Sequence, residues 1–175
     1  KYLKGWDVLR QERFERMKNL GVLPKGTQLS PPENNLNKSR GPLLADYTDY
    51  YAWDSLSAEK KDSLDLEMAV FAAIIDRMDQ NIGRVLKKLE ENGKLENTII
   101  MYLNDNGSCP FYTNKVIDVA PGPANSYWSL RTNWAMLGNT PFRQHKQSGL
   151  EGGSHTPFIV HWPEKIAPNT ITDQV

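Results

Sequence analysis

The sequence predicts a layered α/β fold in which a mainly parallel sheet is flanked by helices. From Leu64 to Leu89, apolar residues recur at helical spacing, which predicts a long amphipathic helix. Residues 98–103 (TIIMYL) are continuously apolar and partly β-branched, as is typical of a strand covered on both faces. Residues 157–162 (PFIVHW) predict a second such strand. A long helix that leads into a buried strand is an αβ unit, and such units build layered sheets.

The other parts of the chain are less regular. Residues 7–20 predict a short amphipathic helix that ends at Gly21. Residues 24–51 carry Pro-Pro, Asn-Asn and Gly-Pro pairs without a sustained period, so we expect a long loop. Residues 107–153, between the two strands, are rich in Gly, Pro, Asn and Ser.

Composition bounds the function. With 175 residues, 39% of them hydrophobic and 24% charged, the chain is long enough for one globular domain. Lys and Arg number 21, as do Asp and Glu, so no net charge attracts nucleic acid or an anionic membrane. The single cysteine, Cys109, excludes an internal disulfide, and the longest apolar stretch, near residues 68–75, is too short to span a bilayer.

Asp105 and Asn106 follow the first predicted strand directly. Ligands of open α/β sheets gather beyond the carboxyl ends of strands, and Gly107 lets the backbone leave the strand there. A carboxylate beside an amide carbonyl offers hard oxygen ligands, which suit Ca²⁺ or Mg²⁺ better than Zn²⁺. Taken alone, the same residues also fit a plain Asp-Asn-Gly turn.

A second group of residues precedes the second predicted strand. Lys146 is followed, after four residues, by Glu151-Gly152-Gly153 and then by the strand that ends at His161-Trp162-Pro163. In isolation these residues fit a solvated lysine and a turn before a strand.

The order of these motifs resembles one family. A strand ending in Asp-Asn-Gly, a variable loop, a lysine, Glu-Gly-Gly and a strand closing in His-Trp-Pro are similar to the formylglycine-dependent sulfatases. These belong to the arylsulfatase family within the alkaline-phosphatase-like superfamily, whose fold is a layered α/β domain. Residues 5–10, 53–57 and 68–79 fit the same family, and residues 108–131 are the least characteristic.

The resemblance implies roles for particular residues. Asp105 and Asn106 would be ligands of the active-site Ca²⁺. Lys146 would bind a sulfate oxygen and act in catalysis, and residues 151–153 would shape the turn that presents it. For His145, His155 and His161 we expect structural or surface roles, with His161 packed in its strand.

The nucleophile is expected outside this chain. The family makes formylglycine from a Cys or Ser in a Cys/Ser-x-Pro-x-Arg motif near the enzyme's N-terminal end. Cys109 does not fit that motif, because Pro110 follows it directly. Residues 1–175 therefore resemble the later portion of the catalytic domain, incomplete at the N-terminus and expected to be incomplete at the C-terminus too.

For the full-length protein the resemblance implies hydrolysis of a sulfate ester, either an aryl sulfate or a sulfated glycan, with formylglycine and Ca²⁺. The isolated segment is expected to be inactive. Its partners would be the sulfated small molecule or glycan and the remainder of the sulfatase chain, without nucleic acid or a membrane span. By the same resemblance, the compartment would be periplasmic, secreted or lysosome-like.

Two other functions stay open. A phosphodiesterase or phosphonate hydrolase of the same superfamily needs similar charge stabilisation, although Asn106 in place of a histidine favours a hard ion and hence sulfate. A non-catalytic carbohydrate-binding remnant could stack sugars on Tyr127, Trp128 and Trp134.

Overall fold

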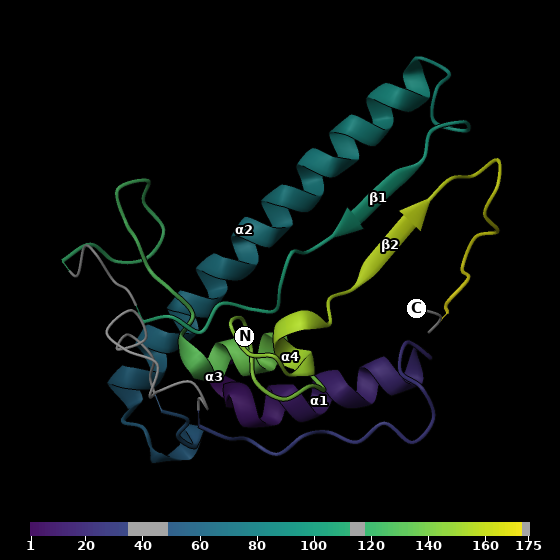
Figure 1. Cartoon of the computed structure of the whole chain (residues 1–175). Helices are drawn as coiled ribbons and strands as arrows, with labels where there is room; N and C mark the ends of the chain where they lie inside the picture. Colours follow the sequence, from purple (N-terminus) through teal and green to yellow (C-terminus); the bar gives the residue numbers. More distant parts are fainter. Residues whose placement is uncertain (35–48, 113–117, 173–175) are drawn as a thin grey trace.

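The computed structural model describes residues 1–34, 49–112 and 118–172. The chain is rich in helix and has one small sheet (Figure 1). In order, the elements are η1 (Tyr2–Lys4), α1 (Gly5–Asn19), η3 (Trp53–Ser55), α2 (Ala58–Glu91), β1 (Ile100–Leu103), α3 (Arg131–Gly138), α4 (Glu151–Ser154) and β2 (Phe158–His161). Both helices predicted from periodicity are present as α1 and α2.

Helix α2 is the longest element. It begins after Ser57, whose hydroxyl accepts a hydrogen bond from the backbone N–H of Lys60 at 3.3 Å, as an N-cap does. Its 34 residues correspond to a rod of about 50 Å. The helix ends before Gly93, which has a left-handed φ of 64° that glycine adopts without strain. Its C-terminal half extends away from α1 and α3 (Figure 1).

The core is an aromatic cluster between α1, the start of α2 and α3. Trp6 meets Trp53 and Trp134 edge to face, with ring centroids 4.8 and 5.1 Å apart. Leu64, the first residue of the predicted apolar face of α2, is completely buried beside them. Gly5 has a φ of 81°, and a Cβ there would lie 2.2 Å from the Trp53 ring. The glycine therefore lets the indole pack directly on the backbone of α1.

A buried ion pair joins α2 to α3. The Arg131 guanidinium donates from Nε and Nη2 to the two carboxylate oxygens of Glu67, at 3.2 and 2.8 Å. The side chains are 6% and 1% exposed, respectively. Burial raises the pKa of Glu67, and the bonds from Arg131 oppose that rise. The sequence analysis did not predict this contact.

Strands β1 and β2 pair with each other, as expected, but their direction corrects the prediction of a mainly parallel sheet. They run antiparallel, with Leu103 opposite Phe158 and Ile100 opposite His161 (Figure 1). The connecting chain returns through α3 and α4 to the end where β1 stops, so β2 starts there and runs back.

The prediction that both strands are largely buried is also wrong for this chain. Met101, Leu103 and Phe158 are 57%, 60% and 60% exposed, and His161, expected to be packed, is exposed as well. An unbroken apolar run indicates that a strand is suited to burial on both faces. It does not specify which polypeptide supplies the covering layers.

Candidate metal and sulfate site

Two loops that carry the predicted site residues lie side by side at one end of the β1–β2 pair. The Gly107 N–H donates to the Gly153 carbonyl at 3.0 Å, and the Lys146 N–H donates to the Ser108 carbonyl at 3.1 Å. Lys146 and the Asp105-Asn106 pair are therefore on adjoining loops, which confirms the expected shared end of the sheet.

Three glycines allow this close approach. A Cβ at Gly107 would lie 1.7 Å from the Gly152 carbonyl oxygen, and one at Gly152 would lie 2.2 Å from that of Arg143. At Gly153 it would lie 2.1 Å from the Ser148 carbonyl oxygen. These contacts are with backbone, which cannot rotate away as a side chain can. The Glu-Gly-Gly motif thus shapes the turn that carries Lys146, as predicted. Gly107 is needed for close approach as well.

Asn139 bridges the two loops with its side-chain amide. Its Oδ1 accepts from the Ser108 N–H at 2.8 Å, and its Nδ2 donates to the Gln144 carbonyl at 3.0 Å. The Gly152 N–H adds a hydrogen bond to the Arg143 carbonyl at 2.8 Å. Sequence reasoning missed Asn139, because an asparagine after a helix is ordinary and its partners here are backbone groups.

The two predicted metal ligands lie where the chain leaves β1. Asp105 is exposed, and Asn106 is half-buried. The Asn106 amide donates through Nδ2 to the Gly107 carbonyl at 2.9 Å, so its oxygen end remains suitable as a ligand. A carboxylate and an amide oxygen fit Ca²⁺ chemically, as part of a shell of six to eight oxygens. Within the described ranges, no group of three or more His, Cys, Asp and Glu side chains could hold a metal ion.

Lys146 is half-buried on a strained part of the backbone. Gln144 and Gln147, on either side of it, have φ values of 62° and 71°. Left-handed geometry costs a non-glycine residue about 1–2 kcal/mol and tends to occur at functional sites. The hydrogen bonds around this loop hold the strained geometry.

The histidines near the site have structural and surface positions, as predicted. His145 is completely buried, and burial lowers its pKa to about 4, so the imidazole is neutral at pH 7. His155 is exposed, lies 2.8 Å from the Glu151 carboxylate and packs on the Phe142 ring, with centroids 4.5 Å apart.

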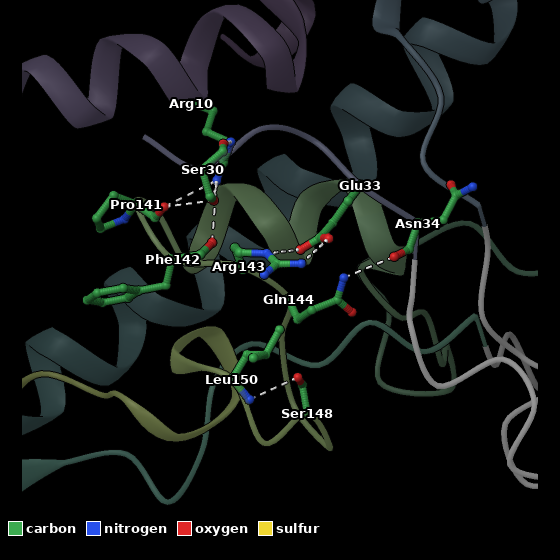
Figure 2. Close-up of polar contacts among 10 residues, drawn as sticks. All are labelled: Arg10, Ser30, Glu33, Asn34, Pro141, Phe142, Arg143, Gln144, Ser148 and Leu150. Atoms are coloured by element: carbon green, nitrogen blue, oxygen red, sulfur yellow. Dashed lines mark hydrogen bonds and ion pairs between the residues drawn. The ribbon is translucent and has the colours of Figure 1, made fainter. Parts of the chain in front are cut away.

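An outer set of polar contacts holds residues 141–144, which precede Lys146 in the chain (Figure 2). Arg10 of α1 reaches Ser30 and the carbonyls of Pro141 and Phe142. Nearby, Arg143 pairs with Glu33, donating from Nε and Nη2 at 3.0 and 2.9 Å. Gln144 donates from Nε2 to the Asn34 carbonyl at 2.9 Å. The sequence analysis predicted none of these contacts.

The aromatic residues suggested for sugar stacking do not form a common surface. Trp134 is completely buried in the core, so it cannot stack on a ligand. The Trp128 indole N–H donates to the Val119 carbonyl at 2.7 Å, and Tyr127 is half exposed.

Known proteins with similar sequences identify the family of this chain. The profile of the Sulfatase family matches residues 30–175. This chain belongs to the sulfatase family. An uncharacterized sulfatase of Schizosaccharomyces pombe is 30% identical over 99% of the chain and 32% of its own length. An arylsulfatase of Klebsiella aerogenes is 28% identical over 93% of the chain and 34% of its own length.

Narrower matches include other members of the sulfatase family. An N-acetylgalactosamine-6-O-sulfatase of Bacteroides thetaiotaomicron is 32% identical over 55% of the chain and 17% of its own length. The chain spans about a third of the length of the Schizosaccharomyces pombe and Klebsiella aerogenes relatives. Sulfatase membership implies the alkaline-phosphatase-like α/β fold, of which this chain has helices and one antiparallel strand pair. Among the described residues, no helix is long and apolar enough to cross a membrane.

Proposed function

We propose that this chain contributes part of the active site of a sulfatase that hydrolyses sulfate esters. The observation that carries the proposal is the pairing of the Asp105-Asn106 loop with the Lys146 loop through Gly107–Gly153 and Ser108–Lys146 hydrogen bonds. Together the two loops offer hard oxygen ligands and one ammonium group at one end of the strand pair. A divalent cation and a lysine are suited to stabilise a sulfuryl group.

Asp105 and Asn106 would hold Ca²⁺, which supplies a positive charge that polarises the sulfuryl group. The Lys146 ammonium would donate hydrogen bonds to a sulfate oxygen and stabilise the negative charge that grows on the bridging oxygen as the sulfur–oxygen bond breaks. The half-buried position of Lys146 strengthens such a contact relative to bulk water.

The nucleophile in this proposal is a formylglycine made from a Cys or Ser outside residues 1–175. That group would supply the nucleophile for sulfur, while Asp105 and Asn106 would hold the metal ion and Lys146 would bind a sulfate oxygen. Cys109 is excluded by its sequence context, so the chain alone would not turn over substrate.

An aryl sulfate and a sulfated glycan are both proposed substrates. The relatives include an arylsulfatase and an N-acetylgalactosamine-6-O-sulfatase, whose names cover both chemical classes. A periplasmic, secreted or lysosome-like location and the remaining sulfatase chain as partner are parts of the same proposal.

Steady-state kinetics on the full-length protein would test this function. We expect hydrolysis of an aryl sulfate that falls at least a hundredfold in Asp105→Asn, because the amide removes one negative charge from the proposed Ca²⁺ site. Asp79→Asn, at an exposed position on α2, is the matched control and should keep full activity.

Two results would contradict the proposal. One is an aryl phosphodiester hydrolysed faster than the sulfate, which would favour the phosphoesterase alternative. The other is equal turnover of Asp105→Asn and the wild-type enzyme.

A further inference from the structure

We propose that Arg10 is a positioning residue for Lys146, acting through the loop of residues 141–144. The inference rests on the proposed function, because positioning Lys146 matters only if that ammonium contacts substrate. It assigns to α1, on the opposite side of the loop from β1, a role in setting the site geometry.

Arg10 contacts Ser30 and the loop of residues 141–144. Its Nη1 donates to the Ser30 carbonyl at 2.5 Å and its Nη2 to the Ser30 hydroxyl at 2.6 Å. The same Nη2 lies 3.5 Å from the Pro141 carbonyl and 3.4 Å from the Phe142 carbonyl. These contacts join α1 to residues 30, 141 and 142, so the guanidinium links a helix to a turn.

Ser30 completes a closed set of hydrogen bonds around the Pro141 carbonyl. That oxygen accepts from the Ser30 N–H at 3.1 Å and from the Ser30 hydroxyl at 2.8 Å (Figure 2). Pro141 has no backbone N–H, so hydrogen bonds can hold the backbone of this residue only through its carbonyl group. Arg10 and Ser30 together hold those carbonyls.

Further hydrogen bonds, from backbone groups and the Asn139 side chain, connect residues 143–144 to Lys146. The Arg143 carbonyl accepts from Gly152, and the Gln144 carbonyl accepts from Asn139, which in turn binds the Ser108 N–H. Ser108 then accepts from the Lys146 N–H. Residues 141–144 are thus held on one side by α1 and on the other by the loops of the site. A shift at Pro141 would therefore be transmitted to Lys146.

Two arginines anchor this loop, and the buried Arg10 contributes more than the exposed Arg143. Arg10 is 6% exposed, whereas the side chain of Arg143, which pairs with Glu33, is 51% exposed. An exposed ion pair contributes little, because solvent screens it. A buried guanidinium bonded to several oxygens is costly to remove, and lysine cannot reproduce its planar fork.

Hydrogen exchange on the chain, followed by mass spectrometry, provides a test that does not depend on activity. In Arg10→Lys we expect the amides of Lys146 and Gly152 to exchange at least tenfold faster, while those of α2 stay unchanged. Ser30→Ala, which removes one hydroxyl from the same set, should accelerate the same amides to a smaller degree and serves if Arg10→Lys fails to fold. Arg16→Lys, exposed on the same helix, is the matched control and should change nothing.

Kinetics of the full-length enzyme on an aryl sulfate provide the second test. A misplaced Lys146 should lower kcat by about tenfold to a hundredfold and change KM little, because the lost stabilisation belongs to the transition state. Ser30→Ala should fall between the wild type and Arg10→Lys.

The outcomes separate the two hypotheses. Unchanged exchange at Lys146 and Gly152 in both Arg10→Lys and Ser30→Ala would overturn the positioning role, as would equally faster exchange in every element. Accelerated exchange of those amides with unchanged kcat would also overturn it. A wild-type enzyme without sulfate ester hydrolysis would instead overturn the proposed function.

Discussion

At the scale of single residues, the proposed site depends on one lysine held in a strained segment. Lys146 lies between two glutamines, Gln144 and Gln147, that both have left-handed backbone geometry. Its N–H donates a hydrogen bond to the Ser108 carbonyl, and among the described residues its ammonium group has no hydrogen-bond partner, so the side chain can reach toward a ligand. Its contribution to core packing is small, which separates its effect on chemistry from its effect on stability.

We expect Lys146→Ala in the full-length enzyme to lower kcat for an aryl sulfate by about a hundredfold to a thousandfold, or roughly 3 to 4 kcal/mol. Lys146→Arg should not restore the full rate, because a planar fork does not reproduce a compact ammonium. Steady-state kinetics with thermal melting in parallel measure both effects. Lys87→Ala, exposed on α2, is the control. Wild-type turnover of Lys146→Ala at an unchanged melting temperature would mean that Lys146 is merely solvated.

His145 predicts a pH dependence of stability. Burial lowers its pKa from the model-compound value of 6.5 to about 4, so the unfolded chain binds a proton more readily than the folded chain. Stability from this residue is therefore complete above pH 6.5 and is lost as the pH falls toward 4, by about 3 kcal/mol in total. The hydrogen bonds from Arg143 lower the pKa of Glu33, the nearby charged group, below its ordinary value.

Urea unfolding between pH 7 and pH 4 tests this expectation. His145→Gln should be less stable at pH 7 because it disturbs a packed site, but its free energy of unfolding should fall less steeply over this range. Equal slopes for the two proteins would show that His145 does not contribute.

At the scale of elements, periodicity predicted the helices well and the strands only in part. Helix α2 carries its apolar stripe within a single segment, so the sequence is sufficient to recognise it. Helix α1 is present as predicted but is not clearly amphipathic, because it buries Arg10 and exposes Val8. The pairing direction of β1 and β2 depends on where the intervening chain turns back, and residues 108–157 contain no period that specifies this route. The three glycines and the position of the Lys146 loop, though not the role of Lys146, could be predicted from the order and spacing of the motifs. Asn139 and Arg10 could not, because they bind backbone carbonyls that any sequence supplies.

The buried pair between α2 and α3 should be strongly destabilising to break. Glu67→Gln leaves the Arg131 charge buried without its counter-charge, and we expect a loss of about 3–5 kcal/mol in the free energy of unfolding. The double variant Glu67→Leu with Arg131→Met should lose much less, because it removes both charges. Urea unfolding measures these differences, with Glu90→Gln on the exposed part of α2 as control. A loss below 1 kcal/mol in Glu67→Gln would show that the pair is not isolated from water.

At the scale of the whole molecule, the proposed Ca²⁺ site is incomplete among the described residues, and the chain exposes much apolar surface. Asp105 and Asn106 offer two side-chain oxygen ligands of the six to eight that Ca²⁺ prefers. We therefore expect residues 1–175 alone to bind Ca²⁺ with a Kd weaker than 1 mM as an order of magnitude. Isothermal titration calorimetry measures this value, and micromolar affinity would mean that the metal site is located elsewhere.

The exposed apolar side chains of β1 and β2 predict a second property of the isolated chain. Met101, Leu103, Phe158 and Ile159 are all more than half exposed, and Val85 of α2 is 61% exposed. Apolar side chains exposed in this way bind hydrophobic dyes and promote association. We expect enhanced fluorescence of the dye ANS that falls when Leu103 and Phe158, opposite each other in the sheet, are both changed to Thr. Unchanged fluorescence in that variant would place the dye elsewhere.

The Glu67–Arg131 contact also constrains how this protein can change over evolutionary time. Replacing either residue alone by an uncharged one leaves an unpaired charge buried in the protein. A lineage with only one of the two replacements would therefore carry a less stable protein. Divergent relatives should therefore retain both side chains or replace the two together with uncharged ones. Substitutions at positions 67 and 131 should therefore occur together, although the two positions are 64 residues apart along the chain.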